Sequence, residues 1–337
     1  MPGTAVQAGE SFAAGIRSEA LSTYKRHRRG PDSRLARVMS LGLPSTRRTE
    51  TYFFYKSAPH IVYWRRNQAI EEKAFGGVAF TVTNKRFARK IPYFRDDARH
   101  DQTRDLLAHA RGLGESAADL DERIYFQIVN GSSDADHLPS IPLSPDGHAL
   151  YSTTNDGSTP RFGVAGGNIL TGSGNVNGVA SAAAVRTDFF ALLSRFHRFQ
   201  DTEGQQLFGD NVLTGPIWLV YGSANIEVFI EAFRQEITMA TNAAPAGVAG
   251  VSNSILAGGL DVRLWSTPKI TTNKWLATLE NAPMKPVFAQ NDEDLREVQY
   301  TDQNSQEALD YDRWAVSFRM SRGYGIFEPY ASIFVDN

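Results

Sequence analysis

The sequence predicts an α+β fold, and three patterns carry that prediction. Apolar and polar residues alternate over residues 314–320, as in a half-buried strand. Two segments rich in aromatic and β-branched residues, 51–66 and 78–94, are typical of further strands. Between these regions, over residues 106–128, apolar residues recur at spacings of three and four, which is the period of an amphipathic helix.

Composition narrows the class of protein. At 337 residues the chain is long enough for one large domain or two ordinary ones. It has no cysteine, which excludes disulfides and thiolate metal sites and fits assembly in a reducing cytoplasm. No run of eighteen apolar residues occurs, and the N-terminal MPGTAVQAGESF lacks the regions of a secretory signal. We therefore expect a folded protein without a membrane span.

Charge is distributed unevenly. The first 50 residues hold nine Lys and Arg against four Asp and Glu, although the whole chain carries a net charge of −2. The cluster KRHRR at 25–29 is typical of a segment that meets nucleic acid, an acidic protein or water, and its shortness favours water or a protein partner.

An arm and a ribbon are predicted before the long helix. Residues 1–45 show weak periodicity, which predicts an extended or partly helical arm. The strands 51–66 and 78–94 flank a polar segment and predict a long two-stranded ribbon. Because an isolated ribbon is marginal in water, we expect it to lie on another surface.

The long helix is predicted from about 98 to 129, a length of roughly 45 Å. Asp96, Asp97 and Asp101 are placed to cap it. Gly112 and Gly114 lie inside it and each cost roughly 1 kcal/mol relative to alanine. Their presence predicts close packing by another element, or a bend.

Residues 130–181, rich in Gly, Pro, Asn, Ser and Asp, predict a long loop region with one or two short strands. Regular elements follow, with Ser223 as the cap of the last helix and the final strands returning to the long helix. They are helices at 185–199 and 223–237 and strands at 216–222, 259–265 and 274–280.

Sequence patterns for chemistry are weak. The Gly-rich segment 163–175 lacks the lysine of a phosphate-binding loop and favours a flexible loop. SDADH at 133–137 offers two adjacent carboxylates, which favours a solvated turn over a metal site. A GxSxG elbow, zinc-finger spacing and an RNA-binding aromatic motif are all missing from the sequence. We therefore predict no catalytic, cofactor-binding or metal-binding residue, and no enzyme.

The order of these segments resembles the major capsid proteins of tailed bacteriophages with the HK97-type fold, and more narrowly the Mu-like major head subunit group. The resemblance covers roughly residues 50–337, and the arm matches in character only. The segments that carry it are NKRFARKIPYFRDD (84–97), SPDGHALYSTTN (144–155), GNILTGSGNVNG (167–178), DTEGQQLFGDN (201–211), PIWLVYG (216–222) and the closing WAVSFRMSRGYGIFEPYASIFVDN.

The resemblance implies an HK97-type fold with an N-arm, an extended β-ribbon E-loop, a P-domain built on a spine helix and a compact A-domain. The E-loop would lie across a neighbouring subunit, and the terminal strands would complete the P-domain sheet under the long helix. The implied divisions are the arm at 1–49, the E-loop ribbon at 50–97, the spine helix and P-domain loops at 98–184, the A-domain at 185–290 and the return strands at 291–337.

The implied function is that of a structural subunit that self-assembles into the icosahedral head shell enclosing phage double-stranded DNA. Its expected partners are copies of itself in hexamers and pentamers, a separate scaffold protein, a portal, optionally a decoration protein, and packaged DNA contacted non-specifically. No cofactor and no membrane are expected. The expected location is the virion, with assembly in the host cytoplasm.

Contact residues are expected on the ribbon and on the arm. For any single ribbon aromatic, packing within its own subunit is an equally good expectation. Some relatives join a ribbon lysine covalently to a neighbour, but Lys73 and Lys85 lack a recognisable acceptor or activating carboxylate, so no crosslink is predicted. The candidates are Phe53, Phe54, Tyr63, Trp64, Arg65, Phe80, Lys85 and Arg86 for the subunit interface, and Lys25, Arg26, Arg28 and Arg29 for the arm.

Three alternatives stay open. The same fold could form an encapsulin-like protein compartment. A different class is an α+β enzyme with its site in the 130–181 loop, formed by Asp134, Asp136, His137 and Asp146. A tail or baseplate protein with β-rich contacts is the third.

Overall fold

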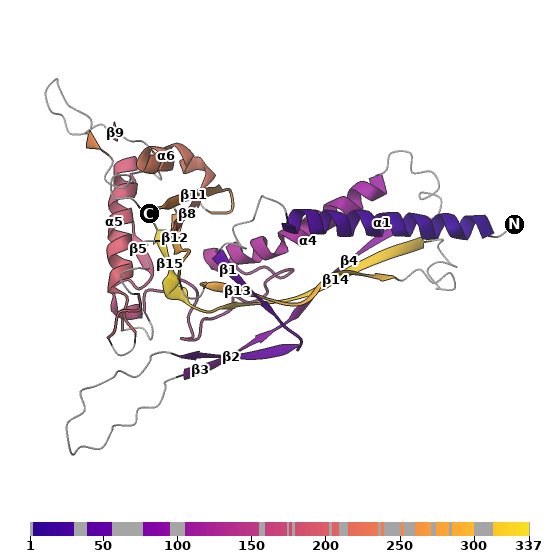
Figure 1. Ribbon diagram of the computed structural model, residues 1–337, viewed down its shortest axis with the longest axis horizontal. Helices are drawn as coiled ribbons and strands as arrows, with labels where there is room; N and C mark the ends of the chain where they lie inside the picture. The colour runs from indigo at the N-terminus through magenta and orange to yellow at the C-terminus, as the bar shows by residue number, and fades with distance from the viewer. Residues whose placement is uncertain are drawn as a thin grey trace, which may run out of the picture.

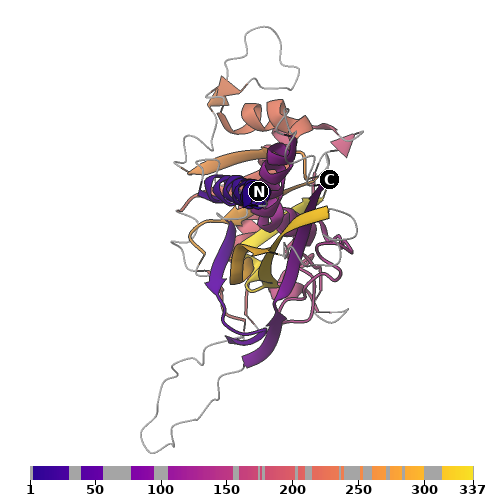
Figure 2. The same ribbon diagram turned by 90° about the vertical axis from the view of Figure 1, so that its right-hand side faces the viewer.

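The computed structural model is elongated, with a sheet and a pair of helices at each end and a β-ribbon projecting from the middle (Figures 1 and 2). It describes residues 3–29, 39–55, 77–94, 105–154, 159–173, 175–176, 179–201, 204–208, 215–234, 237–238, 251–252, 260–270, 274–282, 285–299 and 313–336.

One end contains the long helix α4 (Asp105–Asn130) and a four-stranded sheet. The predicted alternation is confirmed, because Val316, Phe318 and Met320 of β14 are buried on the face toward the helices. In Figure 1, α1 and α4 lie along one face of this sheet. In order, the strands are β1 (Ser40–Pro44), β13 (Val287–Gln299), β14 (Arg313–Ile326) and β4 (Lys85–Phe94).

The N-terminal arm begins with a 27-residue helix, α1 (Gly3–Arg29), which packs on α4 of the same chain. A Cβ atom at Gly114 would lie 2.4 Å from the carbonyl oxygen of Ala20, so only glycine lets the two helix backbones approach this closely. The close packing predicted at Gly114 is therefore confirmed. At Gly112 it is wrong, since a Cβ atom there would meet nothing within 4 Å.

The ribbon is shorter than predicted. It pairs β2 (Thr49–Tyr55) with β3 (Gly77–Thr83), and β4 then begins at Lys85 in the four-stranded sheet. The break falls at Asn84, whose backbone N–H donates to Arg48 O (2.8 Å) and whose side-chain amide donates to Ser45 Oγ (2.9 Å). Assigning residues 85–94 to the ribbon was therefore wrong. Residues 56–66 of the predicted first strand lie outside the described residues.

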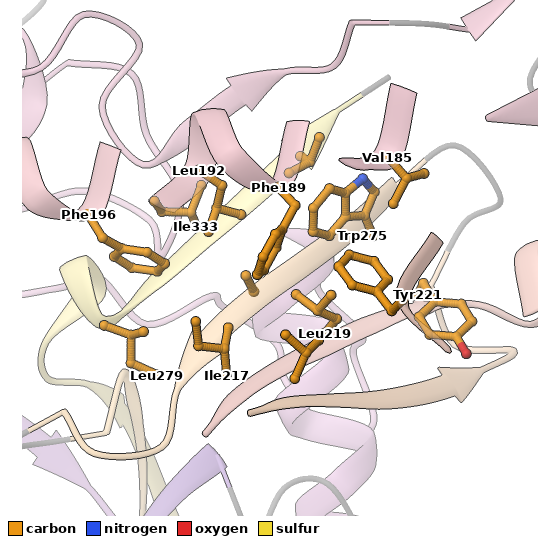
Figure 3. Packing of buried hydrophobic residues seen from close by; sticks show 14 of the residues in the cluster. Val185, Phe189, Leu192, Phe196, Ile217, Leu219, Tyr221, Trp275, Leu279 and Ile333 are labelled. Carbon is orange, nitrogen blue, oxygen red and sulfur yellow. The ribbon is translucent and has the colours of Figure 1, made fainter. Parts of the chain in front are cut away.

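The other end contains a five-stranded sheet with helices α5 (Ala182–Arg198) and α6 (Ile226–Arg234) on one face. Figure 3 shows the core between them, where the apolar side of α5 meets side chains from β8, β12 and β15. The helices and strands predicted for this region are confirmed, with ends shifted by a few residues. In order, the strands are β11 (Val262–Thr267), β8 (Ile217–Gly222), β12 (Lys274–Leu279), β15 (Ser332–Asp336) and β5 (Ile169–Thr171).

The last strand corrects a prediction. β13 and β14 complete the sheet beside the long helix, but β15 joins the five-stranded sheet between β12 and β5. Its side chains are buried on both faces: Ile333 and Val335 pack toward α5, whereas Phe334 packs in the cluster that contains the end of α4. This cover on both faces explains why residues 332–335 of β15 are all buried.

Shorter elements connect these parts. Ser223 is the first residue of a 3-10 turn, whose N-cap is Gly222, and α6 begins only at Ile226, so Ser223 is not the N-cap of the helix and its predicted capping role is wrong. No helix in the described ranges is long and apolar enough to cross a bilayer. The short elements are η1 (Arg161–Gly163), β6 (Asn175–Val176), β7 (Val179–Ala180), η3 (Ser223–Asn225), β9 (Ile237–Thr238), β10 (Val251–Ser252) and η4 (Pro329–Ala331).

Candidate functional site

The loop region after α4 is organised around a buried arginine. Arg161 is fully buried, and its Nε donates to Asp146 Oδ2 at 2.8 Å. The same guanidinium donates to the carbonyl oxygens of Ala149 and Leu150 and to Ser144 Oγ. Partial burial raises the pKa of Asp146, but Arg161 outweighs it and the net pKa lies below the ordinary value. This carboxylate is therefore a structural counter-ion.

The Gly-rich segment folds against the same region, so the flexible loop predicted there is not found in its described part. The Asn168 side-chain amide donates to Leu150 O (2.8 Å) and to Pro329 O (3.0 Å) and ties the loop to the C-terminal segment. Gly167 has φ +54°, and a Cβ atom there would lie 2.2 Å from Ser152 O. Close packing alone explains why a glycine stands at this position, and no phosphate ligand is needed to explain it.

The residues of the enzyme alternative are engaged in two separate local networks. Asp134 accepts from the Asp136 backbone N–H (2.9 Å) and interacts with His137 Nδ1 (2.8 Å), closing a tight turn. Its pKa is lowered, first by that backbone hydrogen bond and then by His137. Asp146 is instead paired with Arg161. Among the described residues, no three His, Asp or Glu side chains are placed to hold a metal ion.

The basic cluster of the arm divides into two kinds of residue. Lys25 and Arg26 are exposed on α1. Arg28 forms an ion pair with Asp294 of β13, inside the same chain. The Arg29 side chain lies outside the described residues. Two of the four predicted arm contacts are thus on the surface of this chain, and one makes a contact within it.

A second buried arginine explains how the arm is attached. Arg322 donates to Tyr24 Oη (3.0 Å) and to Asp294 Oδ1 (2.8 Å), and it lies 3.7 Å from Asp121 Oδ1. Tyr324 Oη donates to Asp121 Oδ1 at 2.7 Å. Partial burial raises the pKa of Asp294, but hydrogen bonds from arginine lower it to about 2. The network joins α1, α4, β13 and β14, and we call it the Arg322 cluster.

The sequence contained a signal for this cluster that was missed. Arg322 continues the period-2 series of buried residues that runs through Val316 and Phe318, so it had to point toward the helices. A buried arginine requires an acidic or polar partner. Which partner it finds, on α1 and β13, depends on contacts nearly 300 and 30 residues away in the chain.

The predicted ribbon contacts are placed very differently. Phe53 is 67% exposed. Phe80 packs edge-on against Phe288 and Phe327 of its own chain, with ring centroids 6.1 and 6.0 Å apart. On β4, Lys85 lies opposite Arg322 and Arg86 lies opposite Ser321, so neither belongs to the ribbon. The Phe54 side chain, Tyr63, Trp64, Arg65 and Lys73 lie outside the described residues.

Large apolar side chains are exposed at both ends of the molecule. On α6, the apolar spacing predicts that Ile226, Ile230 and Phe233 face the core. Phe233 does so, together with Phe229 and Ala232, but Ile226 and Ile230 are exposed. Single exposed apolar residues are common on protein surfaces, whereas Ile226 and Ile230 form an exposed pair one turn apart on α6, as in contacts between proteins. In the described residues, the exposed ones are Phe53, Phe94, Leu143, Phe190, Ile226 and Ile230.

Comparison with known proteins finds similarity in structure only. No protein-family model matches the chain, and no curated protein matches its sequence. The capsid structure of the cyanophage P-SCSP1u has a TM-score of 0.55 and 10% identity, over 90% of this chain and 88% of that chain. The mature capsid of bacteriophage PhiM1 gives 0.55 and 12%, over 90% and 87%. A structure of Mycobacterium phage Patience gives 0.51 and 12%, over 96% and 87%.

These likenesses extend over nine-tenths or more of the chain. At such low identity they establish the fold, and the predicted α+β class with HK97-type architecture is confirmed. The narrower resemblance to the Mu-like group stays a prediction. The chain has the HK97-type fold of tailed-phage capsid proteins.

Proposed function

We propose that the chain is the structural subunit of an icosahedral head shell that encloses phage double-stranded DNA. The observation that carries this proposal is the fold, which matches the P-SCSP1u and PhiM1 capsid structures over 90% of this chain. The exposed apolar groups on the ribbon, α5 and α6 support it, since a shell needs several contact surfaces on each subunit.

Many weak contacts would hold such a shell together. Each interface of ordinary size buries about 1,600 Å² in total, and apolar area contributes roughly 25 cal/mol per Å² before the costs of association. Closing a ring makes the last contact intramolecular, so its effective concentration is high. Each single interface is therefore allowed to be weak while the closed shell is stable.

The parts of the subunit would divide this work. In the proposal the five-stranded end clusters at fivefold and sixfold centres, the ribbon lies on the neighbouring subunit, and the exposed arm residues contact another neighbour or DNA. The further partners we propose are a scaffold, a portal, a decoration protein and packaged DNA. Assembly would take place in the host cytoplasm, and the protein would carry no enzymatic activity.

Electron microscopy of the purified chain tests the proposal directly. We expect closed shells, formed by the chain alone or with a co-expressed scaffold. Discrete monomers at high concentration under both conditions would contradict it, and tubes would favour a tail protein. An encapsulin-like compartment would also give shells. Particles isolated from the cells that naturally make the protein separate the two, because a compartment would hold a protein cargo and a phage head would hold nuclease-resistant DNA.

A further inference from the structure

Helix α6 exposes a surface that is apolar and carries two carboxylates and one arginine, Arg234 in its last turn. Ile226 and Ile230, one turn apart, are 38% and 46% exposed. Glu227 and Glu231 follow them in the sequence and are also exposed, so the two carboxylates run beside the two isoleucines. The opposite side of the helix is filled by Phe229 and its neighbours in the core.

Helix α5 exposes a surface of the opposite charge. Phe190 is 43% exposed, and His197 and Arg198 in the last turn are exposed as well. Described residues of α5 contain one acidic group, Asp188, and it is buried, where it accepts from the Ser173 backbone N–H. The outer side of α5 is therefore apolar and basic.

The two surfaces lie on different sides of the same end of the molecule. In Figure 1, α5 stands along one side of the five-stranded sheet, and α6 crosses its upper end. The helices touch through their inner sides, where the Phe189 and Phe233 rings are 5.1 Å apart. Phe190 on α5 and Ile226 and Ile230 on α6 are exposed among the described residues, so the two outer sides offer contacts for two different neighbours.

We propose that the outer side of α6 in one copy docks on the outer side of α5 in the next copy. Glu227 and Glu231 would then face Arg198 and His197, and the isoleucines would cover Phe190. This inference rests on the proposed shell function and adds the identity of one contact between subunits.

Charge selects this arrangement over a symmetric one. Two α6 surfaces facing each other would bring together four carboxylates and two arginines, a net charge of −2, and two α5 surfaces would oppose their basic ends. Unlike surfaces attract, so the contact is head to tail. In an open row of copies joined head to tail, one α6 surface and one α5 surface stay uncovered at the two ends. Closing the row into a ring covers both surfaces.

Charge reversal in two places tests the contact. Glu231→Arg and Arg198→Glu each place like charges across the interface, and we expect each to weaken association of the subunits by about tenfold or more. In the doubly reversed chain the attraction is restored with opposite polarity, so assembly should recover. The measurement is the concentration at which rings or shells form, by analytical ultracentrifugation and electron microscopy.

Two further variants separate docking from folding. Ile230→Asn removes apolar contact area at a half-exposed position and should reduce assembly while leaving the thermal unfolding of the monomer unchanged. Asp136→Arg, an exposed acidic position in the turn after α4, is the matched control and should assemble as the wild type does.

The outcomes distinguish this inference from the proposed function. If wild-type shells form but the doubly reversed chain is no better than the single variants, or the single variants assemble normally, the docking inference is overturned. If the wild type forms no shells with or without scaffold, the shell function itself is wrong. Recovery of assembly in the doubly reversed chain supports both the docking inference and the shell function.

Discussion

Arg322 and Arg161 are buried cations that each bring together distant parts of the chain. Arg322 joins α1 to β13 and α4, and Arg161 holds the loop that follows α4. Removing one partner of such a group leaves a buried charge less well paired, which costs more than an exposed ion pair is worth. Single substitutions at these positions should therefore lower the free energy of unfolding.

Asp294→Asn should lower the free energy of unfolding by about 1–2 kcal/mol at pH 7. Arg322 and Arg28 lose a charged acceptor, and exposure of Asp294 to solvent limits the loss. The folded pKa of about 2 lies below the unfolded value of about 3.9. The stability from this group is thus fully present above pH ~4 and is lost as pH falls through about 2.

Urea unfolding of wild type and variant at pH 7, 4 and 2.5 measures this dependence. The two proteins should differ most at pH 7 and converge toward pH 2.5. Asp136→Asn, at an exposed position, serves as the control and should track the wild type throughout. A gap between Asp294→Asn and wild type that is the same at all three pH values would refute the role of the charge.

Gly114 and Gly112 form a matched pair in one helix. Gly114→Val should destabilise the fold by about 2 kcal/mol or more, because its Cβ would meet the Ala20 carbonyl of α1 and overpack the contact. Gly112→Ala should instead stabilise by up to about 1 kcal/mol, since the position is open and alanine favours the helix. Denaturant unfolding measures both changes, and effects of the same sign would contradict the packing described.

At the scale of elements, the ribbon is divided between packing within the subunit and exposure. Its base is fixed by Tyr52 and Phe80, which pack on Phe288 of β13. Val82 is buried beside Gly323 and Gly325 of β14. Phe53 points away from this contact and is exposed. The two sides of the ribbon can therefore be tested separately, the packed side for stability and the exposed side for assembly.

Phe53→Asp and Phe80→Ala should have opposite consequences. Phe53→Asp should leave unfolding of the isolated subunit unchanged and prevent assembly, because it adds a charge to a proposed contact surface. Phe80→Ala should lower the free energy of unfolding by about 1–2 kcal/mol, because a half-buried ring loses its aromatic contacts. Thermal unfolding and particle counts by microscopy separate the two effects. Normal shells from Phe53→Asp would remove this residue from the interface.

At the scale of the whole molecule, the C-terminal segment joins the two ends. β14 lies in the four-stranded sheet, and β15 lies in the five-stranded sheet, where its two faces meet α5 and the end of α4. The two ends of the molecule are therefore joined by the C-terminal segment and by the side chains that pack around it. A shell assembled from such units would transmit load through packed cores.

The exposed arm residues allow a test of DNA contact by the assembled protein. If Lys25 and Arg26 meet phosphates, the logarithm of affinity should fall linearly with the logarithm of salt concentration, and Lys25→Ala with Arg26→Ala should reduce the slope by about 0.9 for each lost contact. Filter binding at several salt concentrations measures this. An unchanged slope would assign these residues to a protein partner or to water.

The prediction of the fold from sequence worked where a local pattern repeats over several turns or strand positions. The alternation in β14, the period of α4 and the apolar side of α5 identified buried residues correctly. α6 shows the limit. Apolar residues lie on more than one side of this short helix, and contact with the sheet selected Phe229 and Phe233 over Ile226 and Ile230.

By itself, the sequence determined the class of fold and the identity of its main helices and strands, because hydrophobic periodicity is a property of neighbouring residues. It also supplied the glycine at 114 and the arginine at 322, each of which requires a partner. Only the tertiary structure decided who the partners are: α1 for Gly114, Tyr24 and Asp294 for Arg322, and the five-stranded sheet for β15. Such pairings join segments far apart in the chain, and no local pattern records them.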